Sequence, residues 1–241
     1  MRKPVVIAAA VVALVAMAGL GTAYAYFFSG LRTAPRPLEL SPATASPSVS
    51  APAATQTSLA GAWKVAGGSL ARYRVNEVFA GQQSAHVAVA ETTAVGGGLT
   101  VQDAAGGLQA TALEFTAQLG SLQSVDQVAG FNVSQRDRIV SRSLAVDQYP
   151  SATFKAQSVA LPAALTSGST VSVTIPGELT IHGVTRPAQA AVQLRLNGSH
   201  VEAVGSTSFA MTDFGVAPPQ VPITVVDPNV KVEFQVVLAR G

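Results

Sequence analysis

The sequence contains no cysteine, so disulfide bonds, thiolate metal sites, a cysteine nucleophile and a lipid-modified N-terminal cysteine are all excluded. An exported domain without disulfides must be held together by its hydrophobic core. A chain of 241 residues is long enough to form one sizeable domain with such a core.

Charged side chains are also scarce, and those present are unevenly spread. Residues 1–60 hold four basic side chains and one acidic side chain, whereas the rest of the chain holds eleven basic and twelve acidic. The basic isoelectric point therefore belongs to the N-terminal arm, and the folding part is nearly neutral. It lacks the clustered lysines and arginines that bind phosphates, so nucleic acid is not an expected partner.

Signatures of catalysis are missing as well. The histidines His86, His182 and His200 lie far apart without metal-ligand spacing, and no Gly-x-Ser-x-Gly elbow occurs. The glycines at 96–98 are not followed by the lysine and helix of a phosphate-binding loop. Three carboxylates offer an alternative, but nothing in their spacing predicts that they converge: Asp137, Asp147 and Asp213. We therefore expect no enzyme activity, cofactor or metal.

One long apolar segment stands near the N-terminus. Residues 5–28 carry no charge, and as a helix they would span roughly 36 Å, enough to cross a bilayer core of about 30 Å. Because Arg2 and Lys3 precede the segment, residues 1–28 are predicted to be a single-pass transmembrane anchor with the following domain outside the cytoplasm. A cleaved signal peptide is the alternative, because residues 23–25 fit a small-x-small cleavage site. The domain would then be secreted.

The composition divides the remaining chain into two parts. Residues 29–60 are rich in Pro, Ala, Ser and Thr, which predicts a disordered linker between the membrane segment and the domain. Residues 61–241 are predicted to form the folded domain.

Apolar and polar residues alternate along most of this domain. The clearest runs are 113–119, 171–175, 192–196 and 230–238, and further candidate strands lie at 69–77, 85–93, 152–161, 178–182 and 201–211. Glycine-containing turns are predicted between them, at 96–98, 106–107, 167–168, 182–183 and 197–198. Only 121–144 departs from the alternation, which favours one short helix or loop insert. The fold class predicted is all-β, an antiparallel barrel of about eight strands that can enclose a ligand, with a sandwich as the alternative.

Four landmarks then occur in order along the domain, and together they resemble the YceI-like family of exported, lipocalin-like polyisoprenoid-binding barrels. They are Arg72-Tyr73-Arg74-Val75 with Phe79, Arg136-Asp137 with Tyr149-Pro150-Ser151-Ala152-Thr153-Phe154, the run from Gly177 to Pro187, and Phe209-Ala210-Met211-Thr212-Asp213-Phe214-Gly215. The resemblance covers about 63–238 and implies a lipocalin-like barrel whose interior holds an isoprenoid chain. Many relatives carry histidines where this sequence has Gly68-Ser69 and Glu77, so a different ligand head group is expected.

Ligand-binding residues are expected on the inward faces of the strands and near the barrel mouth. The candidates are Tyr73, Val75, Phe115, Arg136, Asp137, Phe154, Val173, Phe209 and Phe234. The competing interpretation is that the large side chains simply fill the core and that Arg136-Asp137 is a structural ion pair or helix cap. Small inward residues favour a cavity because they leave volume for a guest: Ala71, Ala117, Ala156, Ala190, Ala203 and Gly205.

These observations predict a protein that binds an isoprenoid lipid or quinone outside the cytoplasm, for storage, transfer or protection. A cell-surface interaction module with a filled core is the alternative, and a lipid-acting hydrolase is a third. The expected partners are the lipid and the membrane, and a homodimer is left open.

Overall fold

The computed structural model describes residues 32–42, 58–79, 85–128, 132–221 and 224–241. The predicted transmembrane segment lies outside these residues. Among the helices in the described ranges, none combines the length and the apolar character needed to cross a membrane.

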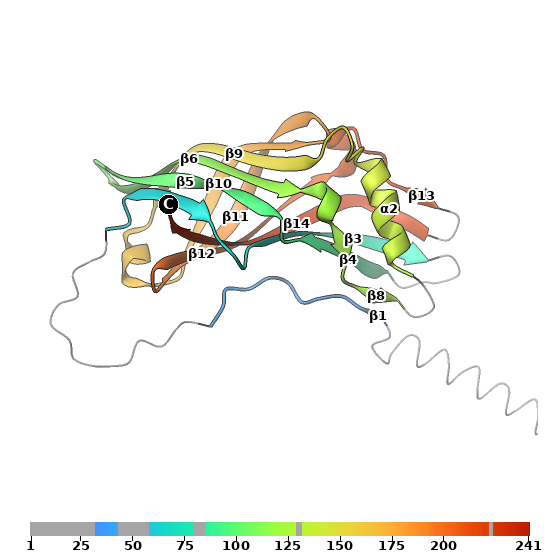
Figure 1. The fold of residues 1–241 in the computed structure, drawn as a ribbon, viewed down its shortest axis with the longest axis horizontal. Helices are drawn as coiled ribbons and strands as arrows, with labels where there is room; N and C mark the ends of the chain where they lie inside the picture. Colours follow the sequence, from blue (N-terminus) through green and yellow to red (C-terminus); the bar gives the residue numbers. More distant parts are fainter. Residues whose placement is uncertain (1–31, 43–57, 80–84, 129–131, 222–223) are drawn as a thin grey trace, which may run out of the picture.

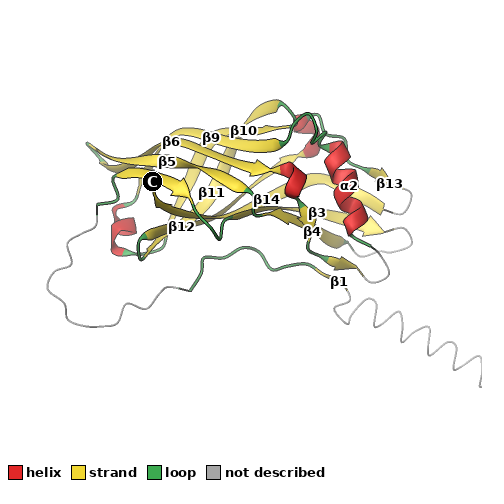
Figure 2. Ribbon diagram, in the orientation of Figure 1, coloured by secondary structure: helices red, strands yellow, loops and turns green. Residues whose placement is uncertain are grey.

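Long antiparallel strands form the body of the molecule (Figures 1 and 2). They are β2 (Gly61–Val65), β3 (Leu70–Phe79), β4 (His86–Thr92), β5 (Val95–Ala104), β6 (Gly107–Gln118), β9 (Ser151–Leu161), β10 (Val171–Ile181), β11 (Val184–Asn197), β12 (His200–Ala210) and β14 (Thr224–Arg240). Shorter elements are β1 (Arg32–Thr33), η1 (Leu119–Ser121), β7 (Gln123–Ser124), β8 (Gln127–Val128), α2 (Ser134–Ser143), η2 (Ala163–Ser167), η3 (Met211–Phe214) and β13 (Gln220–Val221).

The sheet closes on itself through its last strand. In the described part of the chain, the order β14-β12-β11-β10-β9-β6-β5-β2 returns to β14, because β14 pairs with both β12 and β2. This ring confirms the predicted barrel of about eight antiparallel strands. A closed ring leaves no edge within it, so every backbone donor and acceptor of the wall can pair with a neighbour.

The other end of β14 pairs with a different strand. From Thr224 to Gln235 its partner is β3, which pairs with β4, and β4 pairs with β7. Helix α2 contacts β7 and lies across this end of the barrel (Figure 1). The prediction that 121–144 holds one short helix is confirmed.

Two details of the strand prediction were wrong. The separate runs 171–175 and 178–182 are one strand, β10, which continues through Pro176 and Gly177. The predicted turn at 96–98 lies inside β5, where a Cβ on Gly97 would sit 2.0 Å from the carbonyl oxygen of Glu114. These glycines allow β5 to approach its neighbours and do not reverse the chain.

The β10–β11 turn matches its prediction. His182 and Gly183 both have positive φ, 52° and 73°, which is the backbone of a two-residue hairpin turn. A Cβ on Gly183 would lie 2.5 Å from the ring of Tyr149. The turn therefore needs glycine both for its backbone conformation and for this contact.

One half of the barrel is filled by side chains. Trp63 is 2 % exposed, and its indole Nε1 donates to the carbonyl oxygen of Leu59, 2.8 Å away. Around this pair pack apolar residues from most strands, among them Leu113, Leu165, Val171, Val192, Val201, Val236 and Leu238. We call this half the filled end.

A segment that precedes the barrel lies along its outer wall (Figure 1). Residues 32–42, which we call the strap, begin with β1, which pairs with β8. Near the other end of the strap, the backbone N–H and hydroxyl of Ser41 donate to Glu202 Oε1 at 2.9 and 2.6 Å, and Arg195 donates to the Ser41 carbonyl oxygen. The sequence predicted disorder throughout 29–60, and for 32–42 the structure differs because these polar partners hold the extended backbone. Residues 43–57 lie outside the described ranges.

Candidate ligand-binding cavity

The end of the barrel beneath α2 contains a partly open cavity of about 540 Å³. This volume falls within the range of roughly 300–1,000 Å³ that is usual for small-molecule sites. Most of its lining is apolar, with contributions from β3, β6, α2, β12, η3 and β14. The lining includes Val75, Ala117, Ile139, Val140, Leu144, Phe209, Phe214, Val230 and Val232. We call this half the cavity end.

Four of the nine predicted ligand-binding residues line this cavity. They are Tyr73 and Val75 on β3, Arg136 on α2 and Phe209 on β12. Phe209 also stacks edge-on against Phe214, with ring centroids 4.8 Å apart. Contact of these residues with a ligand remains a prediction.

Four others point inward but pack at the filled end. Phe115, Phe154, Val173 and Phe234 all lie against the apolar cluster around Trp63. Phe154 also packs against a second apolar cluster, which borders the cavity and consists of Leu179, Ile181, Phe214 and Val216. Glycines explain the placement of two rings, since an added Cβ would lie 2.6 Å from the Phe154 ring at Gly177 and 2.5 Å from the Phe234 ring at Gly205. Each ring therefore occupies the space that its facing glycine leaves.

The predicted small residues divide in the same way. Ala71 and Ala117 line the cavity, whereas Ala156, Ala190 and Ala203 pack in the cluster at the filled end. Small side chains leave volume only where no large neighbour occupies it, and that depends on residues across the barrel.

The ninth candidate, Asp137, supports the helix. Its carboxylate accepts hydrogen bonds from the backbone N–H and the hydroxyl of Ser124, at 3.0 and 2.6 Å. Asp137 stands in the first turn of α2, where the helix dipole favours a negative charge. This agrees with the structural alternative stated for the Arg136-Asp137 pair, and it fixes the start of α2 to β7.

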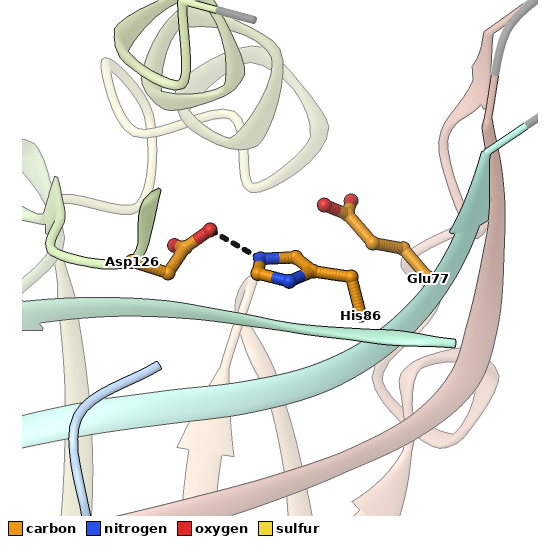
Figure 3. A group of neighbouring side chains, drawn as sticks. All are labelled: Glu77, His86 and Asp126. Carbon is orange, nitrogen blue, oxygen red and sulfur yellow. Dashed lines mark hydrogen bonds and ion pairs between the residues drawn. The ribbon is translucent and has the colours of Figure 1, made fainter. Parts of the chain in front are cut away.

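A buried ionic cluster adjoins the cavity (Figure 3). Asp126 Oδ2 lies 2.7 Å from His86 Nε2, and Asp126 Oδ1 accepts from the backbone N–H of Val89 at 3.0 Å. Arg136 joins Asp126 to Glu77, with hydrogen bonds of 2.6 and 3.1 Å to the first carboxylate and 2.7 Å to the second. Because Glu77 and Arg136 also line the cavity, the cluster gives an otherwise apolar space one charged wall.

The pKa values of the acidic groups move in opposite directions. Burial alone would raise the pKa of Asp126, but hydrogen bonds from His86, Arg136 and Val89 lower it to about 2. Burial raises the pKa of Glu77, and the positive charge of Arg136 opposes that rise. Burial would lower the pKa of the Arg136 guanidinium, but hydrogen bonds and charge from Asp126 and Glu77 raise it. Asp126 and Arg136 therefore stay charged.

The same cluster contains three potential metal ligands. Ligand atoms of Glu77, His86 and Asp126 lie within 4.8 Å of one another. The guanidinium of Arg136 already binds both carboxylates, so a cation would have to displace it. We therefore interpret the cluster as an ion network that holds α2 over the cavity.

Tyr73 brings a polar atom into the cavity. Its hydroxyl oxygen is buried and, among the described residues, has no hydrogen-bond partner. Burial raises the pKa of this phenol well above its usual range, so the group is a neutral donor and acceptor. A buried hydroxyl without a partner costs free energy, which a ligand oxygen would recover.

Sequence reasoning missed most of the cavity lining on α2 and the ionic partners His86 and Asp126. The helical spacing of Ile139, Val140 and Leu144 was the available signal for the lining. No comparable signal marks Asp126, because its partners are 40 residues upstream at His86 and 10 residues downstream at Arg136.

Solved structures resemble this fold at low sequence identity. A polyisoprenoid binding domain from Saccharophagus degradans, implicated in plant cell wall breakdown, shares 14 % identity at a TM-score of 0.55, over 76 % of this chain and 99 % of that one. Burkholderia cenocepacia BcnA shares 18 % identity at 0.45, over 68 % and 95 % of the two chains. A Campylobacter jejuni YceI protein shares 15 % identity at 0.34, over 57 % and 79 %. At 14 % identity, the likeness to the first of these structures concerns the fold.

A comparison with curated proteins gave no match. The YceI-like domain family, in contrast, matches residues 66–238, which is most of the chain and nearly all of the barrel. The order of landmarks in the sequence and the closed barrel agree with that match, and the chain belongs to the YceI-like family.

Proposed function

We propose that this protein binds an apolar lipid with an isoprenoid chain in the cavity beneath α2, outside the cytoplasm. The supporting observation is an apolar cavity of about 540 Å³ that contains one buried, unpartnered hydroxyl, that of Tyr73, among the described residues. A chain with a single polar end matches this distribution. The family and the neighbouring polyisoprenoid binding domain support the same ligand class.

Apolar burial supplies the affinity in this proposal. Each buried CH₂-sized group contributes about 0.8 kcal/mol, so ten such groups contribute about 8 kcal/mol. That is comparable with the association cost, which is on the order of 4–15 kcal/mol. Longer burial or head-group hydrogen bonds then give net binding.

The polar wall would select the head group. Tyr73 can donate to, or accept from, a ligand oxygen, and Glu77 and Arg136 line the same cavity. A hydroxyl or a quinone carbonyl fits this set, since both can hydrogen-bond to a neutral phenol.

The protein is proposed to hold and release its ligand without turnover. Among the described residues, the charged groups that line the cavity are held in ion pairs, Arg136 with Glu77 and Asp126, and Arg72 with Glu91. The sequence-based alternative of a wholly filled core describes the filled end but not the cavity end.

In this proposal, the location of the barrel outside the cytoplasm is inferred from the sequence. Residues 5–28 would retain the barrel at the outer face of the cytoplasmic membrane, or direct its secretion if they are cleaved.

The test is mass spectrometry of an organic extract from the full chain, purified from bacterial membranes in mild detergent. A near-stoichiometric isoprenoid lipid is the expected result. The Ala117→Phe variant, which places a ring in the cavity, is the control and should lose this lipid. If wild type and variant carry the same lipids, or if the wild type takes up no added isoprenoid quinone, the proposal fails.

A further inference from the structure

The strap is attached to the strand that carries Tyr73. On β3, Tyr73 faces the cavity while its neighbours Arg72 and Arg74 meet the strap outside. Arg74 Nη2 donates to the carbonyl oxygen of Pro35 at 2.5 Å, and Arg72 Nη1 donates to that of Arg36 at 3.1 Å. The arginines are themselves held by ion pairs, Arg74 to Glu233 at 2.7 Å and Arg72 to Glu91 at 2.8 Å.

The direction of the strap is defined by its partners. It begins at β1, whose partner β8 directly follows Asp126 of the ionic cluster. It then passes Arg74, which is opposite Lys231 of β14, and reaches Glu202, which is opposite Val237 of the same strand. The chain therefore arrives at the cavity end and runs toward the filled end, as Figure 1 shows.

Chain length limits how far the cavity end can lie from the apolar segment. The uncharged run ends at Phe28 and the strap begins at Arg32, so the two are joined by four residue steps. Four steps span at most roughly 14 Å. An undocked linker from Phe28 to Leu59 would instead extend to roughly 110 Å. The docked strap therefore removes most of the reach that the linker composition predicts.

The surface at the cavity end suits a lipid headgroup layer. Arg138 and Arg142 are exposed on α2 and, four residues apart, share one face of the helix. Val225, at the β13–β14 hairpin of the same end, is 73 % exposed. Basic residues are attracted to an anionic membrane surface, and an exposed valine can enter the interface.

From these relationships we propose that the strap holds the cavity end of the barrel against the membrane surface, so that a lipid passes between bilayer and cavity without crossing bulk water. This inference rests on the proposed lipid binding and on residues 5–28 remaining in the bilayer. It assigns an orientation to the barrel, which binding alone does not.

The orientation can be measured by fluorescence quenching on the full chain. Because the sequence has no cysteine, V225C and S199C each provide one labelling site. Val225 lies at the cavity end, while Ser199 follows β11, whose thirteen steps from Val184 span roughly 43 Å. In vesicles of phosphatidylglycerol and phosphatidylcholine with a nitroxide on the headgroup, the V225C label should lose most of its emission and the S199C label should keep it.

A strap-release variant, in which contacts of the strap with the barrel are removed, tests whether the strap causes the orientation. Thr33→Pro with Arg74→Ala should remove β1 pairing and one carbonyl contact, and the difference between the two labels should then disappear. The control is Arg186→Ala, which removes an exposed arginine bound to the Asp213 carbonyl oxygen and should keep the difference.

Equal quenching at both sites in the parent chain would overturn the orientation, as would protein that does not stay with the vesicles. An unchanged difference in the strap-release variant would overturn the role of the strap. Lipid extracted from the same preparations reports on binding separately, so an oriented but empty barrel and a loaded but unoriented barrel are distinguishable.

Discussion

The guanidinium of Arg136 binds the carboxylate of Asp126 through two hydrogen bonds of 2.6 and 3.1 Å, and this pair joins helix α2 to the β7–β8 segment. The Asp126 side chain is fully buried, and Arg136 also reaches Glu77 on β3. Helix α2, which covers the cavity, is thus held to the barrel wall by ion pairs as well as by apolar contacts.

Removing one partner of this pair should destabilise the fold strongly. Asp126→Asn leaves Glu77 as the one carboxylate that pairs with Arg136 among the described residues, and it weakens the bond to His86. Breaking a buried ion pair costs about 3–5 kcal/mol. Urea denaturation measures the change. Glu114→Gln is the control, because its pair with Lys155 is more than half exposed and should change stability by less than about 1 kcal/mol. If Asp126→Asn lowers the free energy of unfolding as little as Glu114→Gln does, the ion network is not needed for stability.

The same carboxylate should make the fold sensitive to acid. The pKa of Asp126 is lowered to about 2, so its stabilising contribution is present above its unfolded pKa of about 4 and is lost as pH falls from there through 2. The loss should be on the order of 2 kcal/mol. Denaturation midpoints between neutral pH and pH 2 measure it. Asp126→Asn should flatten this part of the profile, and an unchanged slope would contradict the assignment.

Replacing an alanine by phenylalanine should have different effects at the cavity end and at the filled end of the barrel. Ala117→Phe puts a ring into the cavity and should block lipid uptake with a change in stability below about 1.5 kcal/mol. Ala190→Phe, at a position 3 % exposed in the packed cluster, should cost about 1–3 kcal/mol instead. Thermal unfolding and quinone uptake by the same samples give both readouts. If Ala190→Phe blocks quinone uptake while Ala117→Phe mainly lowers stability, the ligand-binding cavity is not at the end beneath α2.

Tyr73→Phe tests head-group recognition. Removing the unpartnered hydroxyl should leave stability unchanged or slightly higher, because no protein hydrogen bond is lost among the described residues. Affinity for an isoprenoid with an oxygen head group should fall about 2- to 12-fold, since a hydrogen bond contributes about 0.5–1.5 kcal/mol. A matching hydrocarbon without oxygen should bind equally to both forms. If the affinities for both ligands fall equally in Tyr73→Phe, the hydroxyl does not recognise the head group.

Gly205→Ala should be costly for steric reasons. The new methyl would lie 2.5 Å from the Phe234 ring and 2.6 Å from the carbonyl oxygen of Ala191, and backbone cannot move away as a flexible side chain can. Overpacking of this kind costs about 1–3 kcal/mol. Gly106→Ala, with no atom within 4 Å of its added Cβ, is the matched control for denaturation. Similar stability of the two variants would contradict the close packing.

The sequence determined the local structure of most of the barrel. Alternation with a period of two specifies a strand with one buried face. The runs at 192–196 and 230–238 lie in strands, and so does 113–119 except for Leu119, which begins η1. The turn at His182-Gly183 was predictable for a similar reason, because it depends on backbone conformation at two adjacent residues. The ordered motifs also identified the family.

The tertiary structure decided where the interior is filled and where it is hollow. Inward-facing Phe115 and Phe209 look alike in an alternating pattern, yet one packs at the filled end and the other lines the cavity. The difference depends on which residues stand across the barrel, and closure of the sheet sets those neighbours. In the same way, the carbonyl oxygens of Pro35 and Arg36 carry no sequence signal for docking, because their partners Arg72 and Arg74 are brought to them only when the barrel forms.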